Sequence, residues 1–269
     1  MKIGIFDSGI GGLSLLYELS ARLPDAEFIY FADSENAPYG EKSADEIVAL
    51  TERALLFLVG HGADAIVLAC NTATAAAAKP LRAKYPELRI FGMEPAVNEA
   101  AKKVKSGKIL ATATPLTLGG EKYHDLLDRT GAEDRTVSLP LPTLVRLAER
   151  ELFDRALPEC KGAEDYVRER LDGIGVNTDD VAAVVLGCTH FTYFTDAFRR
   201  LVPDRPIFNG ISGTASHVIN TLGLSSAPDG EKADVESIAR RTEFYISTVP
   251  AAEAKMKGFL NCLELLRRV

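Results

Sequence analysis

The chain carries one pattern twice: AIVLACNT at residues 65–72 and AVVLGCTH at residues 183–190. In both copies an apolar run of strand length ends in a cysteine, Cys70 or Cys188, and polar residues that can open a helix follow. Ligands of open α/β sheets bind outside the carboxyl ends of the strands, so each cysteine stands where such a sheet holds its site. The repeat therefore predicts two similar halves that present two thiols to one cleft.

Short apolar runs alternate with helical patterns along the rest of the chain. We expect strands at Ile3–Phe6, Phe28–Ala32, Ala65–Ala69, Ile90–Gly92, Ile109–Thr112, Val181–Gly187 and Phe244–Ser247. Ser43 precedes the helical pattern of residues 44–58 with Glu46 three residues on, which is a capping box. The βαβα order predicts an α/β fold of mostly parallel sheets flanked by helices, and 269 residues suffice for two domains.

Composition narrows the class of protein. The chain is 46% hydrophobic and 26% charged, as in an ordinary globular protein. Its formal charge of −7 disfavours nucleic acid as a partner, because phosphates need a basic surface. The first residues, MKIGIFD, run straight into a strand pattern without a secretory signal, and no stretch approaches the ~20 apolar residues of a membrane span. We expect a cytoplasmic protein that does not bind membranes.

The four cysteines are far apart and form no C-x-x-C pair, which disfavours a zinc site or a disulfide framework and favours thiols. For Cys70 and Cys188, the N–H groups and dipole of the following helix are expected to lower the thiol pKa. The alternative for either one alone is an inert buried cysteine. Cys160 and Cys262 lack a comparable turn, and we interpret them as structural.

A glycine-rich turn, DSGIGG at residues 7–12, follows the first expected strand. Such a turn allows a ligand to approach the backbone at a helix N-terminus, so a nucleotide site is the obvious rival. The dinucleotide fingerprint G-x-G-x-x-G fails at its third glycine, where Ser14 stands, although Asp33 resembles its ribose-binding acid. The Asp7 carboxylate would also repel a pyrophosphate. We therefore expect neither a nucleotide nor another cofactor.

A polar loop, DSENAPYG at residues 33–40, follows the second expected strand. It could be an ordinary connection, because Pro and Gly are common in turns. Loops at the carboxyl ends of strands nevertheless often bind substrate. Tyr39 and Gly40 can offer a hydroxyl and backbone amides to an anion.

Four motifs, in this order, make the chain resemble the glutamate racemases of the aspartate/glutamate racemase superfamily. They are DSGIGGL (7–13), PYG (38–40), CNTA (70–73) and GCTH (187–190). The resemblance extends nearly end to end, and includes LATAT (110–114) and FYIS (244–247).

The resemblance implies cofactor-independent interconversion of L- and D-glutamate, which supplies D-glutamate for peptidoglycan. It also implies two pseudosymmetric α/β domains with the site in the cleft between them. Residues 1–95 plus 208–269 would form the first domain, which carries Cys70, and residues 96–207 the second, which carries Cys188. Family members often form homodimers.

By motif, the resemblance assigns Cys70 and Cys188 as the two acid/base thiols, with no metal. Asp7 and His190 carry over as their polar helpers, and Glu149 as a further assistant. The implied substrate contacts are Asp7, Ser8, Pro38, Tyr39, Gly40, Cys70, Asn71, Thr72, Thr114, Cys188, Thr189 and His190. Two opposed thiols suit racemisation, because a base must act on one face of the α-carbon and an acid on the other.

The chain departs from the family pattern at Leu141, where the family usually has cysteine, and at Phe191-Thr192-Tyr193, where it commonly has Tyr-Pro-Leu. These departures bear on side-chain specificity, for which aspartate is the main competing substrate. Two other classes stay open. A cysteine hydrolase could use Cys188 and His190, but it would need only one thiol. A two-lobed binding protein would clamp an amino acid without exchanging its α-proton.

Overall fold

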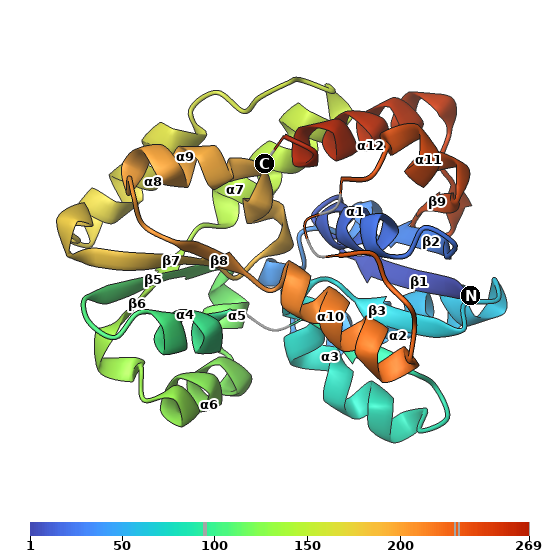
Figure 1. Ribbon diagram of the computed structural model, residues 1–269, viewed down its shortest axis with the longest axis horizontal. Coiled ribbons are helices and arrows are strands. Elements are labelled where there is room, and N and C mark those ends of the chain that lie inside the picture. Colours follow the sequence, from blue (N-terminus) through green and yellow to red (C-terminus); the bar gives the residue numbers. More distant parts are fainter. Residues whose placement is uncertain (94–95, 229, 231, 269) are drawn as a thin grey trace.

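The computed structural model describes residues 1–93, 96–228, 230 and 232–268 (Figure 1). Its strands are β1 (Lys2–Asp7), β2 (Glu27–Ala32), β3 (Ala65–Leu68), β4 (Ile90–Gly92), β5 (Lys108–Ala113), β6 (Thr136–Pro140), β7 (Val181–Leu186), β8 (Ile207–Asn209), β9 (Thr242–Ile246) and β10 (Val249–Pro250). Its α-helices are α1 (Leu13–Arg22), α2 (Ala44–Gly60), α3 (Asn71–Lys84), α4 (Val97–Lys103), α5 (Pro115–Gly119), α6 (Glu121–Thr130), α7 (Pro142–Leu147), α8 (Ala163–Gly173), α9 (Thr195–Leu201), α10 (Ile211–Leu222), α11 (Val235–Arg240) and α12 (Glu253–Leu266). Shorter helical turns are η1 (Ser34–Asn36), η2 (Tyr39–Glu41), η3 (Glu133–Arg135), the π-helix η4 (Ala148–Asp154), η5 (Thr178–Asp180) and η6 (Thr189–Phe194).

The strands form two sheets with the same internal order. One sheet runs β10-β9-β2-β1-β3-β4 and the other β6-β5-β7-β8. The pairs β1·β2, β1·β3 and β3·β4 are parallel, as are the corresponding pairs β5·β6, β5·β7 and β7·β8. This arrangement confirms the predicted α/β class and makes β3 and β7, which precede Cys70 and Cys188, equivalent strands.

Helices cover both faces of each sheet (Figure 1), so the strands are buried on both sides and consist of continuous apolar runs. The four residues of β3 are all buried, as expected for a parallel strand with helices on both sides. Ser43 caps α2 with the predicted capping box: its hydroxyl accepts from the Glu46 N–H, and the Glu46 carboxylate accepts from the Ser43 N–H.

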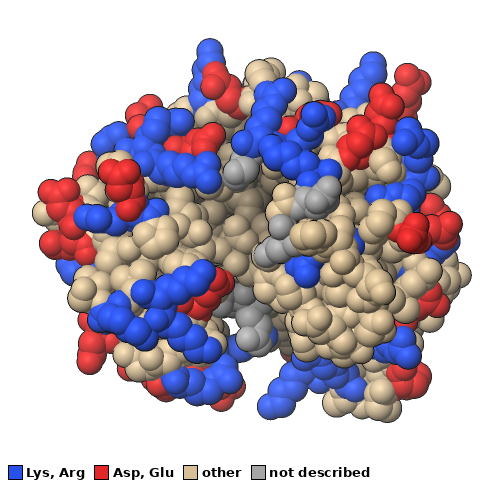
Figure 2. Space-filling view, viewed as in Figure 1, with Lys and Arg blue, Asp and Glu red and all other residues tan. Residues whose placement is uncertain are grey.

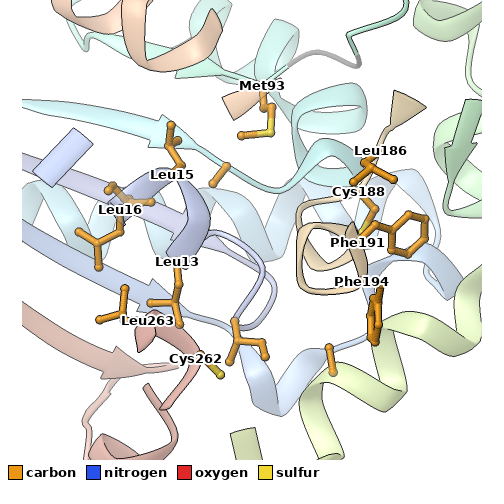
Figure 3. Close-up of a cluster of buried hydrophobic side chains, with 14 of the residues drawn as sticks. Leu13, Leu15, Leu16, Met93, Leu186, Cys188, Phe191, Phe194, Cys262 and Leu263 are labelled. Carbon is orange, nitrogen blue, oxygen red and sulfur yellow. The ribbon is translucent and has the colours of Figure 1, made fainter. Parts of the chain in front are cut away.

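The core consists of three clusters of buried apolar side chains. One cluster lies against α2 and α3 and another against α4 and α6. The largest joins the two halves, since it includes Leu13 and Leu16 of α1 together with Leu186 of β7, Cys188 and Phe191 (Figure 3). The end of β7 and the start of η6 are thereby held in packed apolar surroundings.

The surface carries both signs of charge. Figure 2 shows lysine and arginine interspersed with aspartate and glutamate, and a hollow between the two halves on this face. Among the helices of the described residues, none is both long and apolar enough to cross a membrane.

Some elements differ from the sequence prediction. The strands β6, β8 and β10 were not predicted. The expected strand Phe244–Ser247 is shifted: β9 spans Thr242–Ile246, and Ser247 begins the turn to β10. The division into domains at residues 95/96 and 207/208 stays a prediction.

Candidate active site

The two equivalent strand ends bring Cys70 and Cys188 to one cavity. Cys70 follows β3 and stands at the N-cap of α3, and Cys188 follows β7 and stands before η6. Their exposed fractions are 5% and 8%. Both cysteines line the same cavity, so the two halves enclose a shared space, as the repeated sequence predicts.

The cavity draws its lining from both halves of the chain. It is lined by Ser8, Pro38, Tyr39, Gly40, Glu41, Cys70, Asn71, Thr72, Thr114, Pro115, Pro142, Val145, Cys188, Thr189 and His190. Its interior is about 20 Å³, room for about one water molecule. An amino acid is larger than this space, so the lining must rearrange before one can enter.

Buried groups surround Cys70. Its sulfur lies 3.5 Å from the Ser8 hydroxyl and accepts a 3.5 Å hydrogen bond from the Ala73 N–H. Burial, and next the nearby Asp7 carboxylate, raise the pKa of the Cys70 thiol to about 12, although Ser8 and the Ala73 N–H oppose this. The sequence-based expectation of a lowered pKa is thus wrong for Cys70, because burial outweighs the helix N-terminus. Cys70 is held as a neutral thiol.

A histidine and a carboxylate stand behind Cys188. Its sulfur lies 3.9 Å from Nδ1 of His190, and Nε2 of His190 lies 2.6 Å from Oε1 of Glu149. Burial alone would lower the pKa of His190, but its hydrogen bonds with Cys188 and Glu149 raise it well above the ordinary value. Nδ1 of a protonated His190 can donate a hydrogen bond to the Cys188 sulfur.

The glycine-rich turn lets the two halves approach closely. A Cβ at Gly9 would collide with the Glu149 carboxylate, and a Cβ at Gly11 would collide with Thr189 and His190. The Ile10 N–H donates to Glu149 Oε1 at 2.9 Å. These glycines therefore make room for side chains of the other half of the chain.

Asp7 stands at the end of β1, beneath this turn. Its carboxylate accepts from the Gly9 N–H at 2.9 Å and from the Thr189 hydroxyl at 3.0 Å. Burial raises the pKa of the Asp7 carboxyl, and the neighbouring His190 only partly opposes this. Asp7 thus bonds a residue next to Cys188 and also acts electrostatically on Cys70.

Hydroxyl groups cluster at the side of the cavity. Thr72 Oγ1 lies 3.0 Å from Thr114 Oγ1, and Thr117 Oγ1 lies 2.9 Å from Thr114 and 3.3 Å from Thr72. Asn71 donates to the Met93 sulfur, while its buried Oδ1 has no hydrogen-bond partner among the residues that the structure describes. The cavity thus combines hydroxyl donors with a buried acceptor.

Most of the residues singled out in the sequence come together here. Asp7 and Glu149 lie just behind the cavity wall, bonded to the lining residues Thr189 and His190. Leu141, at a departure from the family pattern, is fully buried in the core, and its neighbour Pro142 lines the cavity.

Other residues of interest lie outside the cavity or were missed. Cys160 is half-buried, and Cys262, in α12, is buried in the largest apolar cluster (Figure 3). His61 stacks on Phe57 at the surface. Sequence reasoning missed the lining residues Glu41, Pro115, Pro142 and Val145. It also missed Thr117, which bonds the lining residues Thr72 and Thr114. For Thr117 a signal existed, because Thr114 before Pro115 is typical of a helix N-cap, whose side chain accepts from the N–H three residues on. Within the described ranges, no group of His, Cys, Asp and Glu side chains could hold a metal ion.

The fold agrees with comparisons to known proteins. The chain matches the Asp/Glu/Hydantoin racemase family over residues 14–218, and it belongs to that family. It is similar to curated glutamate racemases: it is 43% identical to that of Campylobacter curvus, over 91% of this chain and 92% of the relative. It is 41% identical to the glutamate racemase of Halothermothrix orenii, over 98% of this chain and 99% of the relative.

Solved structures give the same result. The glutamate racemase of Escherichia coli, in complex with L-glutamate and an activator, superposes with a TM-score of 0.76 at 26% identity, over 93% of this chain and 99% of that one. The glutamate racemase of Aquifex pyrophilus superposes with a TM-score of 0.66 at 30% identity, over 91% of this chain and 89% of that one.

Proposed function

We propose that the protein interconverts L- and D-glutamate by moving the α-proton between Cys70 and Cys188, without a cofactor. The observation that carries the proposal is that both sulfurs, held by equivalent strand ends, line one cavity. The names of the relatives support glutamate as the substrate. A cysteine hydrolase would need only one of these two thiols.

The surroundings of the thiols support different roles in the free enzyme. Cys70, with its pKa raised to about 12, is the acid. Cys188, beside a protonated His190, is the base. For one enantiomer Cys188 takes the α-proton and Cys70 donates a proton to the opposite face, and for the other enantiomer the roles reverse. Asp7 and Ser8 then serve Cys70 as His190 and Glu149 serve Cys188.

The remaining lining residues would hold the two ends of the amino acid. The hydroxyls of Thr72 and Thr114 can donate to a carboxylate and stabilise the charge that develops when the α-proton leaves, whereas the Thr189 hydroxyl already donates to Asp7. The buried Oδ1 of Asn71 can accept from the ammonium group. Ser8, Tyr39 and Gly40 also line the cavity and would contact the other carboxylate.

The wider setting belongs to the same proposal. We place the enzyme in the cytoplasm, where it would supply D-glutamate for peptidoglycan, and we propose a homodimer. Within each chain, residues 1–95 plus 208–269 and residues 96–207 would form two domains that part to admit glutamate. This last step is supported by a cavity of about 20 Å³, which is too small for the substrate as it stands.

Circular dichroism of the purified protein tests this function directly. The signal of L-glutamate should decay to zero without an added cofactor, whereas those of L-aspartate and L-alanine should persist. Decay with L-aspartate but not with L-glutamate would transfer the proposal to aspartate racemisation.

A further inference from the structure

Ser247 occupies a backbone position that favours glycine. The hairpin pairs Ile246 with Val249, so Ser247 and Thr248 form a two-residue turn between β9 and β10. Ser247 has a φ of 51°, in the left-handed region. Two-residue turns with a positive φ at their first residue usually place glycine there, because a side chain is strained in this conformation. The strained serine therefore suggests a use for its hydroxyl.

That hydroxyl is aimed at a buried carboxylate. It donates to Asp33 Oδ1 at 2.9 Å, and the Ser247 N–H donates to the Ala32 carbonyl at 2.7 Å. Ser247 is 7% exposed and Asp33 is 3% exposed. The bond joins the end of β9 to the end of β2, which are neighbouring parallel strands (Figure 1).

Asp33 connects Ser247 to the loop that lines the cavity. Its Oδ1 also accepts from Asn36 at 2.9 Å, and its Oδ2 accepts from the Tyr39 hydroxyl at 2.6 Å. Burial, and next the Asp33 carboxylate, raise the pKa of Tyr39, so the phenol remains a donor. Two side chains of the loop after β2 are thus fixed by the carboxylate that Ser247 holds.

Tyr39 belongs to the wall that closes the cavity. It is 1% exposed, packs against Phe6 and lines the cavity beside Cys70. Its neighbour Gly40 approaches so closely that a Cβ there would lie 2.9 Å from the Cβ of Thr114, in the other half of the chain. A small displacement of Tyr39 would therefore change the fit between the two halves around the substrate.

We propose that Ser247 is a positioning residue for the substrate pocket: its hydroxyl orients Asp33, which orients Tyr39 and the Pro38–Gly40 wall. The inference rests on the proposed function for the identity of the substrate. The simpler alternative is that the hydroxyl only stabilises the hairpin between β9 and β10. The two can be separated because glycine at this position relieves strain while it removes the hydroxyl.

The experiment compares Ser247→Ala and Ser247→Gly with the unchanged protein, measuring KM, kcat and Tm. Both variants should raise KM for glutamate about fivefold, which corresponds to the loss of one typical hydrogen bond, with kcat changed by less than about twofold. Ser247→Gly should keep or increase Tm. The matched control is Asp204→Gly, at an exposed residue with a φ of 59°. It should increase Tm in the same way and leave KM unchanged.

A second readout does not depend on glutamate. Iodoacetamide should label Cys70 about fivefold faster in both Ser247 variants, because the wall beside it is loosened by the loss of one hydrogen bond. Cys160, which lies away from the cavity, serves as the internal reference for peptide mass spectrometry. If the unchanged protein does not racemise glutamate, the proposed function fails, and the labelling rates alone decide the role of Ser247. An unchanged KM or labelling rate in Ser247→Gly, or a Tm below that of the unchanged protein, would overturn the positioning role.

Discussion

Nε2 of His190 lies 2.6 Å from Oε1 of Glu149, although Glu149 belongs to the π-helix η4 and His190 to the turn η6. The same carboxylate oxygen accepts from the Ile10 N–H, so Glu149 is fixed from two sides. Since His190 in turn contacts Cys188, the carboxylate controls the protonation of the group beside the proposed base.

Glu149→Gln should lower activity by weakening this control. Glutamine keeps the shape but loses the negative charge that raises the pKa of His190. His190 would then lose its proton at lower pH, and the alkaline limb of the pH profile of kcat/KM should move about one unit toward acid. On the alkaline side of both limbs, the fall in kcat/KM should approach about tenfold. A profile with an unmoved alkaline limb would assign Glu149 a purely structural role.

Gly11→Ala adds only one methyl group, but it should disrupt the site. The added Cβ would collide with Thr189 and with backbone and ring atoms of His190, so one side of the cavity must shift. A displacement of this kind should lower kcat by about a hundredfold. The control is Gly213→Ala in α10, where nothing lies within 4 Å of the added Cβ. It should leave kcat unchanged and stabilise the helix by about 0.5–1 kcal/mol. Similar kcat values for the two variants would contradict the close-approach account.

Asp7→Asn should lower the racemisation rate and raise Tm at alkaline pH. Folding raises the pKa of Asp7, so the folded protein binds this proton more tightly than the unfolded chain. The contribution of Asp7 to stability is therefore most favourable below the unfolded pKa of about 4, and it is lost as pH rises through the folded pKa. Asparagine is never charged, and we expect it to raise Tm by about 2–4 °C at pH 8 and to make no difference at pH 4. Racemisation should fall about a hundredfold, because a helper of Cys70 is lost. A lower Tm at pH 8 would mean that the two hydrogen bonds of Asp7 outweigh the cost of its burial.

Elements that depend on a few neighbouring residues were predicted correctly from the sequence. The strands before Cys70 and Cys188, and the cap at Ser43, could be read from runs of a few residues. The strands β8 and β10, with three and two residues, offer little periodicity and were missed, although β4, also with three residues, was predicted.

Contacts between distant segments could not be predicted in the same way. The bond between Ser247 and Asp33 joins residues 214 positions apart, and no local pattern in either segment indicates it. The pKa of Cys70 was mispredicted for a related reason, since its burial depends on packing from several elements and outweighs the local helix N-terminus. The resemblance supplied Glu149, but only the fold placed it against His190 and Ile10.

The central claim is that two thiols act on opposite faces of one α-carbon. The most direct measurement is proton NMR of L-glutamate in heavy water with the unchanged protein, Cys70→Ala and Cys188→Ala, each checked for folding by Tm. The unchanged protein should replace the α-proton with deuterium while D-glutamate accumulates, and each variant should lose racemisation by at least about a thousandfold. If either variant still forms deuterated D-glutamate at a substantial rate, one thiol suffices and the two-base account is wrong.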